Sequence, residues 1–220
     1  MDPFPVAAAA AAATSTLKVA TGICLVPQRD AIQMAKSVAT VDQLSGGRFL
    51  FGVGIGWNQD EMENHGASFK MRIPICREQI EAMQQIWTQS KAEYHGRYVD
   101  FDPMMTWPKP VQKPYPPIWV GGNIPNGAGR ALEYGDGWLP HASRPEYRLI
   151  DRLDLWEDMK QKAGRHIPVT PFGAEHDPDI WPEYRDAGME RIVISMASES
   201  RDDVLPKLDA MAAGIARVSA

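Results

Sequence analysis

The residues best suited to chemistry lie where a short apolar run, residues 117–120, passes through glycines into the expected start of a helix. Such a junction offers backbone N–H groups and the positive end of a helix dipole, which together bind phosphate. An arginine one turn into the helix adds a charged donor. We therefore predict a phosphate cradle, although a loop that needs glycine only for its turn would have the same sequence. The predicted cradle consists of Gly121, Gly122, Asn123, Asn126, Gly127 and Arg130.

Side chains that could transfer a proton are few. His141 ends the apolar run 137–140, and Glu61 lies on the loop after residues 48–55; these two are our candidates for catalysis. A surface histidine and a solvated glutamate are the alternatives. The other histidines, and the cysteines Cys24 and Cys76, stand at no ligand spacing, so we expect no metal site. No Ser-His-Asp or Cys-His arrangement supports hydrolysis.

Charge and composition exclude several classes of protein. The chain has 220 residues, a formal charge of −5 and 44% hydrophobic residues, which is typical of a globular protein. Its acidic balance and lack of basic runs argue against a nucleic-acid partner. No apolar stretch approaches the roughly 20 residues that span a bilayer, so we expect no membrane partner. Two cysteines without a disulfide framework favour a cytoplasmic setting.

The hydrophobic pattern predicts the elements that must position these residues. We expect strands at 17–26, 48–55, 117–120, 137–140, 167–172 and 191–196. A helix at 3–14 precedes them, and helices follow them, with caps at Asp30 and Gly46. The clearest stripe is Cys76, Ile80, Met83 and Trp87, and the last helix has the apolar face Leu205, Leu208, Ala212 and Ile215. Residues 91–117 form a Pro-rich excursion with a hairpin in it.

One helix followed by six strand-then-helix units predicts a parallel sheet covered by helices. An open doubly wound sheet and a (β/α)8 TIM-type barrel both fit this order, and spacing alone leaves them nearly even. Neither Thr21–Cys24 nor the glycines at 52, 54 and 56 form the G-x-G-x-x-G turn of a nucleotide-binding open sheet.

Four segments, in order and at matching spacing, resemble the luciferase-like monooxygenase family, in particular its branch of deazaflavin (coenzyme F-420)-dependent oxidoreductases. They are Val41–Phe49, Gly52–Trp57 with Glu61, Pro116–Asn123 and Tyr134–Pro140. The resemblance runs from about residue 2 to the C-terminus. It implies one barrel domain, residues 1–220, in which about six βα units are present and the first strands of the barrel are missing. Six strands cannot close the barrel, so the strands at 17–26 and 191–196 would be open edges for a partner, such as the second copy in a homodimer.

The resemblance also implies where a cofactor would bind. Gly22-Ile23 matches the place where these enzymes often have a non-prolyl cis peptide that backs the cofactor ring. Gly54 and Gly56 would leave room, and Trp57 would wall the ring or the substrate pocket; a core tryptophan in a tight barrel interior is the alternative. The function implied is hydride transfer between a deazaflavin (coenzyme F-420) and a small organic substrate. An FMN-dependent monooxygenase and an inactive partner subunit are the alternatives.

Overall fold

The computed structural model describes residues 1–219, and these residues divide into two compact units. Unit 1 is Met1–Gly121, and unit 2 begins at Gly122. We describe each unit by itself.

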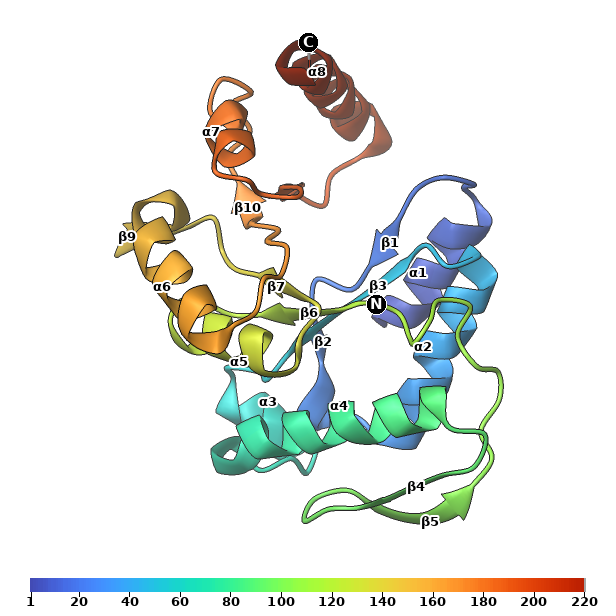
Figure 1. The fold of residues 1–220 in the computed structure, drawn as a ribbon. Helices are drawn as coiled ribbons and strands as arrows, with labels where there is room; N and C mark the ends of the chain where they lie inside the picture. The colour runs from blue at the N-terminus through green and yellow to red at the C-terminus, as the bar shows by residue number, and fades with distance from the viewer. Residues whose placement is uncertain (220) are drawn as a thin grey trace. The chain divides into compact units, whose positions relative to one another are not determined.

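The core of unit 1 is a parallel sheet centred on β3 (Phe49–Gly54) (Figure 1). Strand β6 (Ile118–Gly121) pairs with one side of β3, with Phe51 opposite Ile118. On its other side, β3 pairs with β1 (Val19–Ala20) and then with β2 (Cys24–Leu25). The prediction of one continuous strand over 17–26 was therefore wrong, because the chain leaves the sheet between β1 and β2.

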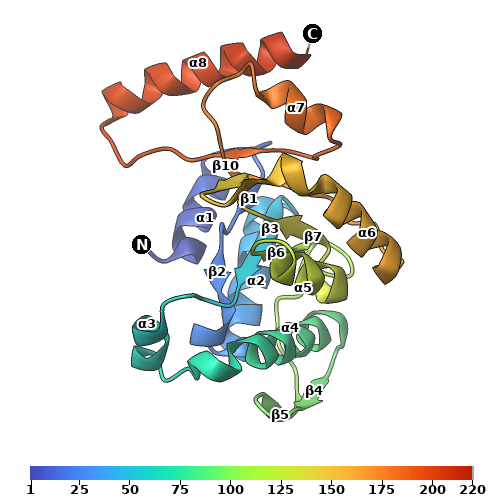
Figure 2. The ribbon, with the colours of Figure 1, turned by 90° about the vertical axis from the view of Figure 1, so that its left-hand side faces the viewer.

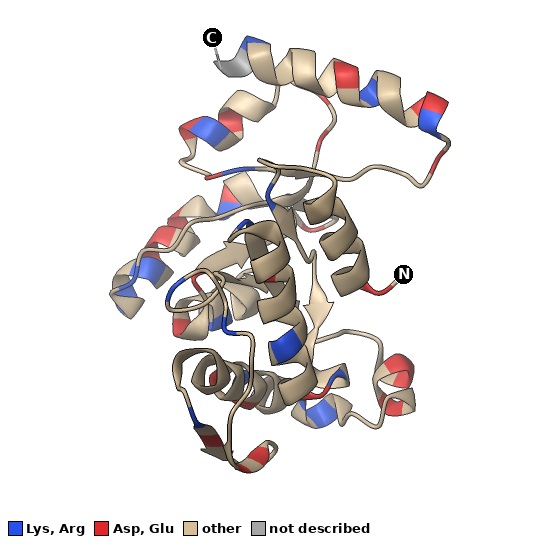
Figure 3. Ribbon diagram, turned by 90° about the vertical axis from the view of Figure 1, so that its right-hand side faces the viewer, with Lys and Arg blue, Asp and Glu red and all other residues tan. Residues whose placement is uncertain are grey.

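Helices α1 (Pro3–Ala12), α2 (Ala31–Ser45) and α4 (Arg72–Thr88) flank this sheet, with α1 packed on α2 and α2 on α4 (Figures 1 and 2). The predicted caps are confirmed: Asp30 accepts a hydrogen bond from the Gln33 amide, and Gly46 ends α2 with φ +61°. The predicted α4 stripe is buried. Figure 3 shows α1 to be free of charged residues.

Shorter elements complete unit 1. The hairpin predicted in the Pro-rich excursion is confirmed as β4 (Ala92–His95) and β5 (Asp100–Met104). Helix α3 (Gln59–Asn64) follows β3. Two 3-10 turns occur, η1 (Val26–Gln28) and η2 (Phe69–Met71).

Unit 2 alternates short strands and helices. Its elements are α5 (Asn126–Tyr134), β7 (Gly137–Leu139), β8 (Ser143–Arg144), β9 (Tyr147–Arg148), η3 (Leu149–Arg152), α6 (Leu153–Ala163), β10 (Phe172–Ala174), α7 (Trp181–Asp186), β11 (Val193–Ile194) and α8 (Arg201–Ser219). Trp138 of β7 packs on Trp156 of α6, with ring centroids 4.6 Å apart. Strands β10 and β11 pair in parallel.

Two predictions for unit 2 need correction. The strand expected at 167–172 is reduced to single bridges at Val169 and Phe172, and regular pairing begins only at β10. The predicted apolar face of α8 is exposed at Leu205, Leu208 and Ile215, because the helix instead places Gly214 against Pro178 and Trp181. Glycine allows close contact on a side of the helix that the hydrophobic pattern does not mark.

Within residues 1–219, neither unit by itself contains a closed barrel, in agreement with the expected incomplete (β/α)8 architecture. Across the same residues, no helix combines the length and the hydropathy that a membrane span requires.

Candidate functional site

The segment between β1 and β2 presses its backbone against β3. The hydroxyl of Thr21 donates a hydrogen bond to the Gly52 carbonyl (2.7 Å), and the Thr21 carbonyl oxygen lies 1.8 Å from the point that a Cβ on Gly52 would occupy. The Gly22-Ile23 peptide bond is cis, as the resemblance implied. A side chain at residue 52 would therefore displace this segment.

Ile23 fills the space over two other glycines of the sheet. Its Cδ1 lies 1.9 Å from the Cβ point of Gly54, and its Cγ2 lies 3.1 Å from that of Gly121. The expectation that Gly54 leaves room for a ligand was therefore wrong, since Ile23 occupies the room. Gly54 and Gly121 instead let the Gly22-Ile23 peptide lie close to the carboxyl ends of β3 and β6.

The loop after β3 carries the other candidates of unit 1. Gly56 has φ +80°, and Met62, which is fully buried, lies 3.0 Å from its Cβ point. Asn58 caps α3 by accepting a hydrogen bond from the Glu61 amide. Glu61 is exposed in the first turn of this helix, so the expectation that it lies on a loop was wrong. Trp57 is 85% exposed, which excludes the alternative of a core tryptophan. Its ring is free to contact a ligand.

In unit 2, the loop that leads into α5 folds tightly around Gly122. Gly122 has φ +126°, and the Nη2 atom of Arg130 lies 2.8 Å from its Cβ point. A Cβ on Gly127 would lie 2.1 Å from the Gly122 carbonyl carbon, so both positions require glycine. The Gly127 amide donates a hydrogen bond to the Asn123 carbonyl (2.5 Å). Gly127 therefore lets the chain pass close to Gly122, but its amide is not free to bind a ligand.

Two buried polar atoms beside this loop have no hydrogen-bond partner within the described residues: Asn123 Oδ1 and Arg130 Nε. A buried polar atom without a partner costs about 1–3 kcal/mol, so such atoms are expected to meet a ligand or water. Asn126 is exposed at the first position of α5. The loop thus combines two kinds of donor, a helix N-terminus and a guanidinium, with an amide oxygen that accepts. Such a combination suits a phosphate joined to a polyol.

His141 follows β7 and bridges to Phe172, with its ring edge-on to the phenyl ring at 5.9 Å. Burial lowers the pKa of His141 below its usual 6.5, and the charge of Arg144 lowers the pKa further. The imidazole is therefore neutral at pH 7 and able to accept a proton.

The described residues offer no metal-ligand cluster, and the Cys24 thiol is not activated. No cluster of three or more His, Cys, Asp or Glu side chains there could hold a metal ion. Cys24 and Cys76 are buried, and burial raises the pKa of the Cys24 thiol to about 11, so that thiol is not a nucleophile at neutral pH.

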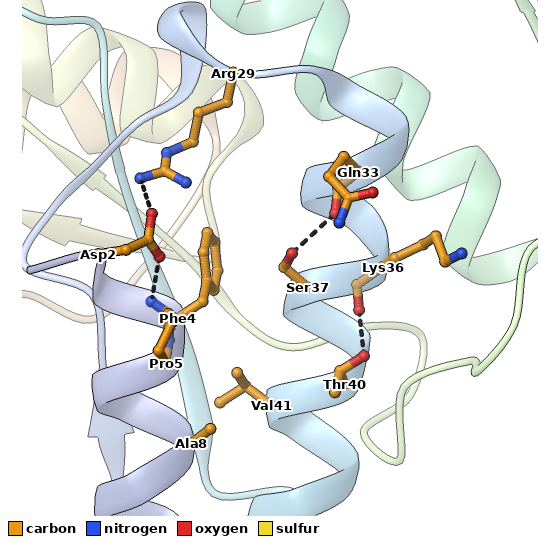
Figure 4. Close-up of a pocket in the computed structure, with 10 residues that line it drawn as sticks. All are labelled: Asp2, Phe4, Pro5, Ala8, Arg29, Gln33, Lys36, Ser37, Thr40 and Val41. Atoms are coloured by element: carbon orange, nitrogen blue, oxygen red, sulfur yellow. Dashed lines mark hydrogen bonds and ion pairs between the residues drawn. The ribbon is translucent and has the colours of Figure 1, made fainter.

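A groove of about 500 Å³ lies between α1 and α2 (Figure 4). Phe4, Ala8 and Val41 form its apolar part, and Asp2 pairs with Arg29 at one end (2.7 Å). None of the predicted site residues lines it. No sequence pattern predicts this groove, because its residues come together only when α1 packs on α2.

Part of the family-like motif at 41–49 has a structural role. Arg48 donates hydrogen bonds to the carbonyls of Ala11, Thr14, Leu17 and Ser45, and so ties the end of α1 to the end of α2. Asp42, fully buried, accepts two hydrogen bonds from Gln112. The motif therefore fixes the helices and the Pro-rich segment around β3.

Comparison with known proteins places this geometry in a family. The profile of the luciferase-like monooxygenases matches residues 1–182. An uncharacterized protein of Mycobacterium tuberculosis is 36% identical over 224 residues, which is 98% of this chain and 77% of that protein. An FMNH(2)-dependent dimethylsulfone monooxygenase of Pseudomonas putida is 33% identical over 165 residues, which is 74% of this chain and 44% of that protein.

Solved structures show the same fold. A monooxygenase from Streptomyces bottropensis matches with a TM-score of 0.70 and 23% identity, over 98% of this chain and 63% of its own. A coenzyme F420-dependent tetrahydromethanopterin reductase from Methanopyrus kandleri matches with a TM-score of 0.65 and 24% identity, over 81% of this chain and 57% of its own. This chain thus spans less than two thirds of either structure. Taken with the profile match, these findings show that the chain belongs to the luciferase-like monooxygenase family of oxidoreductases.

Proposed function

We propose that this chain is an oxidoreductase that binds a deazaflavin of the coenzyme F-420 type and exchanges a hydride with a small organic substrate. The observation that supports a phosphate-bearing cofactor is the loop Gly122–Gly127 with Arg130, where the chain packs tightly around two glycines and two buried polar atoms have no partner within residues 1–219. The resemblance of the four sequence segments to the deazaflavin-dependent branch favours F-420 over FMN. Deazaflavin and flavin cofactors both join a flat ring to a phosphate through a polyol chain, and this loop suits those last two groups.

Different residues of the loop would bind different parts of the cofactor. Arg130 and the N-terminus of α5 would hold the phosphate, since both present donors and positive charge. The free Oδ1 of Asn123 would accept a hydrogen bond from a hydroxyl of the polyol chain. Gly122 and Gly127 would keep the backbone close enough for these contacts.

In unit 1, the Gly22-Ile23 peptide would back the ring, with Gly56 and Gly121 beside it and Trp57 as a wall. The bound ring supplies the hydride chemistry, and the protein orients it and keeps water away. The exposed Trp57 ring supports this role, because a large apolar surface exposed in the free protein is available to a ligand.

His141 is the better candidate for proton transfer, because its neutral imidazole can take the hydroxyl proton of an alcohol substrate whose hydroxyl-bearing carbon gives up a hydride to the bound ring. Glu61 is the second candidate, and its exposure makes it the weaker one.

An FMN-dependent monooxygenase is the second candidate function. The observation in its favour is the dimethylsulfone monooxygenase, which is FMNH(2)-dependent and 33% identical to this chain. The loop of unit 2 suits FMN as well as F-420, because both carry a phosphate.

The test is a paired titration of the purified chain with coenzyme F-420 and with FMN, followed by quenching of tryptophan fluorescence. Saturable micromolar binding of F-420 with weaker binding of FMN is the expected result. Tighter binding of FMN would replace the proposal by the second candidate. A folded chain that binds neither would overturn both, and would favour an inactive partner subunit.

A variant and its control connect this result to the loop. Arg130→Gln should weaken binding of the preferred cofactor about tenfold or more, because a charge-assisted hydrogen bond is lost. Lys162→Gln removes a charge from the exposed Lys162–Asp158 pair on α6 and should leave binding unchanged.

We further propose that the chain works in the cytoplasm as a homodimer, with neither nucleic acid nor membrane as a partner. Its two thiols are free and buried, which suits a reducing compartment. Sedimentation equilibrium would measure the mass of the assembly, and a monomer at micromolar concentration would refute the dimer.

A further inference from the structure

The hairpin formed by β8 and β9 carries a tyrosine that the predicted site did not include. Tyr147 begins β9, where it is the cross-strand partner of Arg144. The rest of its side chain is partly exposed, but its hydroxyl oxygen is buried and finds no hydrogen-bond partner within residues 1–219. The sequence gives no sign of this, because residues 143–148 show no periodicity that would indicate which side chain is buried.

The Tyr147 hydroxyl faces the same loop as Arg130. The backbone amide of Ile124 lies close enough to the phenol oxygen to lower the pKa of Tyr147, but its geometry falls short of a hydrogen bond. The Tyr147 hydroxyl therefore has its hydrogen available for an acceptor beyond the described residues. A buried hydroxyl donor without a partner is satisfied by a ligand oxygen that accepts its hydrogen bond.

The charges around Tyr147 decide what kind of oxygen this is. Burial raises the pKa of Tyr147, and Arg144, the Ile124 amide, and Arg152 oppose that rise. The guanidinium of Arg152 lies 5.6 Å from the centroid of the tyrosine ring. Among the main influences on the pKa of Tyr147, Glu146 is the acidic one. An acceptor among these arginines is more stable when it is an anion.

We propose that Tyr147 is a further ligand-binding residue of unit 2, whose hydroxyl donates a hydrogen bond to a phosphate oxygen held at the Gly122–Gly127 loop. The ligand class is a phosphate monoester or diester. This inference rests on the proposed function, because the phosphate is that of the bound cofactor. It adds a donor from the β8–β9 hairpin to the donors of the loop and α5.

The test compares FMN with riboflavin, which has the same ring and polyol chain but no phosphate. In Tyr147→Phe, the Kd for FMN should rise about tenfold, the effect of one lost hydrogen bond to a charged group. The Kd for riboflavin should stay within twofold of the wild-type value. The Kd for F-420, a phosphodiester, should rise like that for FMN.

Tyr98→Phe is the matched control, because the Tyr98 hydroxyl is likewise buried without a partner among the described residues, but lies beside the β4–β5 hairpin of unit 1. It should change neither Kd. Both variants remove a buried hydroxyl that has no partner within the described residues, so neither should lower the thermal midpoint. Arg144→Gln should weaken FMN binding by a smaller factor, and only at low salt.

The outcomes separate this inference from the proposed function. If Tyr147→Phe binds FMN and F-420 as tightly as the wild type, the inference is overturned and the proposed function stands. If Tyr147→Phe loses affinity for riboflavin as much as for FMN, the hydroxyl does not bind the phosphate, and the inference is again overturned. Wild-type protein that bound neither FMN nor F-420 would overturn both.

Discussion

The Cδ1 atom of Ile23 lies 1.9 Å from the point that a Cβ atom on Gly54 would occupy. This relationship connects the Gly22-Ile23 peptide to β3 through a side chain that fills the space over a glycine. A comparable approach at Gly52 involves the backbone oxygen of Thr21, at 1.8 Å. A side chain can move away from Gly54, but a backbone carbonyl cannot move away from Gly52. The free energies of unfolding of alanine variants at the two positions should show this difference.

Gly54→Ala should lower the free energy of unfolding by about 1–3 kcal/mol, the usual effect of overpacking a core. In the double variant Ile23→Ala, Gly54→Ala, the added methyl group has the space that Ile23 left. The second substitution should then cost less than about 1 kcal/mol in that background. Urea denaturation of the four proteins in this double-mutant cycle gives the coupling energy.

Gly52→Ala should cost about 3 kcal/mol in either background, because a backbone carbonyl cannot move aside as a side chain can. Equal rescue of Gly52→Ala and Gly54→Ala by Ile23→Ala would contradict the assignment of the two contacts.

Asp42→Ala should destabilise the protein by about 2–3 kcal/mol. In the wild-type structure the Gln112 backbone amide donates a hydrogen bond to Asp42 Oδ2 (3.0 Å), and the substitution removes this acceptor. It also removes the acceptor of the Gln112 side-chain amide. Asp60→Ala, at an exposed position of α3, is the control and should change stability by less than about 0.5 kcal/mol. Equal urea midpoints for the two variants would refute the structural role of Asp42.

Glu78→Gln should loosen the tip of the β4–β5 hairpin. The Glu78 carboxylate accepts hydrogen bonds from the backbone amides of Arg97, Tyr98 and Val99. An amide group in its place turns one acceptor oxygen into a donor that faces these donors. Hydrogen exchange of the three amides should accelerate about tenfold or more. Glu93→Gln, at an exposed position of β4, should leave their exchange rates unchanged.

The stability of the protein should fall as the pH drops below about 6.5, and His141 should be one cause. Burial lowers the folded-state pKa of this histidine. Just below pH 6.5 the unfolded chain therefore binds more protons at this site than the folded chain does, and stability rises with pH. His141→Gln should flatten that part of the pH profile and leave the profile above pH 7 unchanged.

His95 supplies a contrast of opposite sign. Its hydrogen bond to Asp100 (2.8 Å) raises the pKa of His95, so its contribution is present at low pH and is lost as the pH rises through the folded-state pKa. His95→Gln should therefore remove a decline in stability that begins near pH 6.5 and ends at the raised folded-state pKa, whereas His141→Gln acts on the slope below pH 6.5. Thermal unfolding between pH 5 and 8 would compare the two variants, and identical slopes would contradict both assignments.

The sequence by itself determined most of the longer helices, because capping and periodicity are local, but it did not predict the short helix α3. Asp30 and Gly46 mark the ends of α2 by type, and α5 begins at Asn126 and ends at Tyr134 as expected. The family-like motifs determined the class of enzyme, and the glycines around Gly122 marked a loop that suits phosphate.

Only the tertiary structure decided what fills the spaces that glycines leave and which polar atoms remain unpaired. Residues 17–26 read as one strand, because apolar alternation does not record where a chain leaves its sheet. The space over Gly54 is filled by Ile23. Polar atoms of Asn123, Arg130 and Tyr147 are buried and have no partner within residues 1–219. Such facts depend on contacts between segments that are distant in the sequence, and no local pattern contains them.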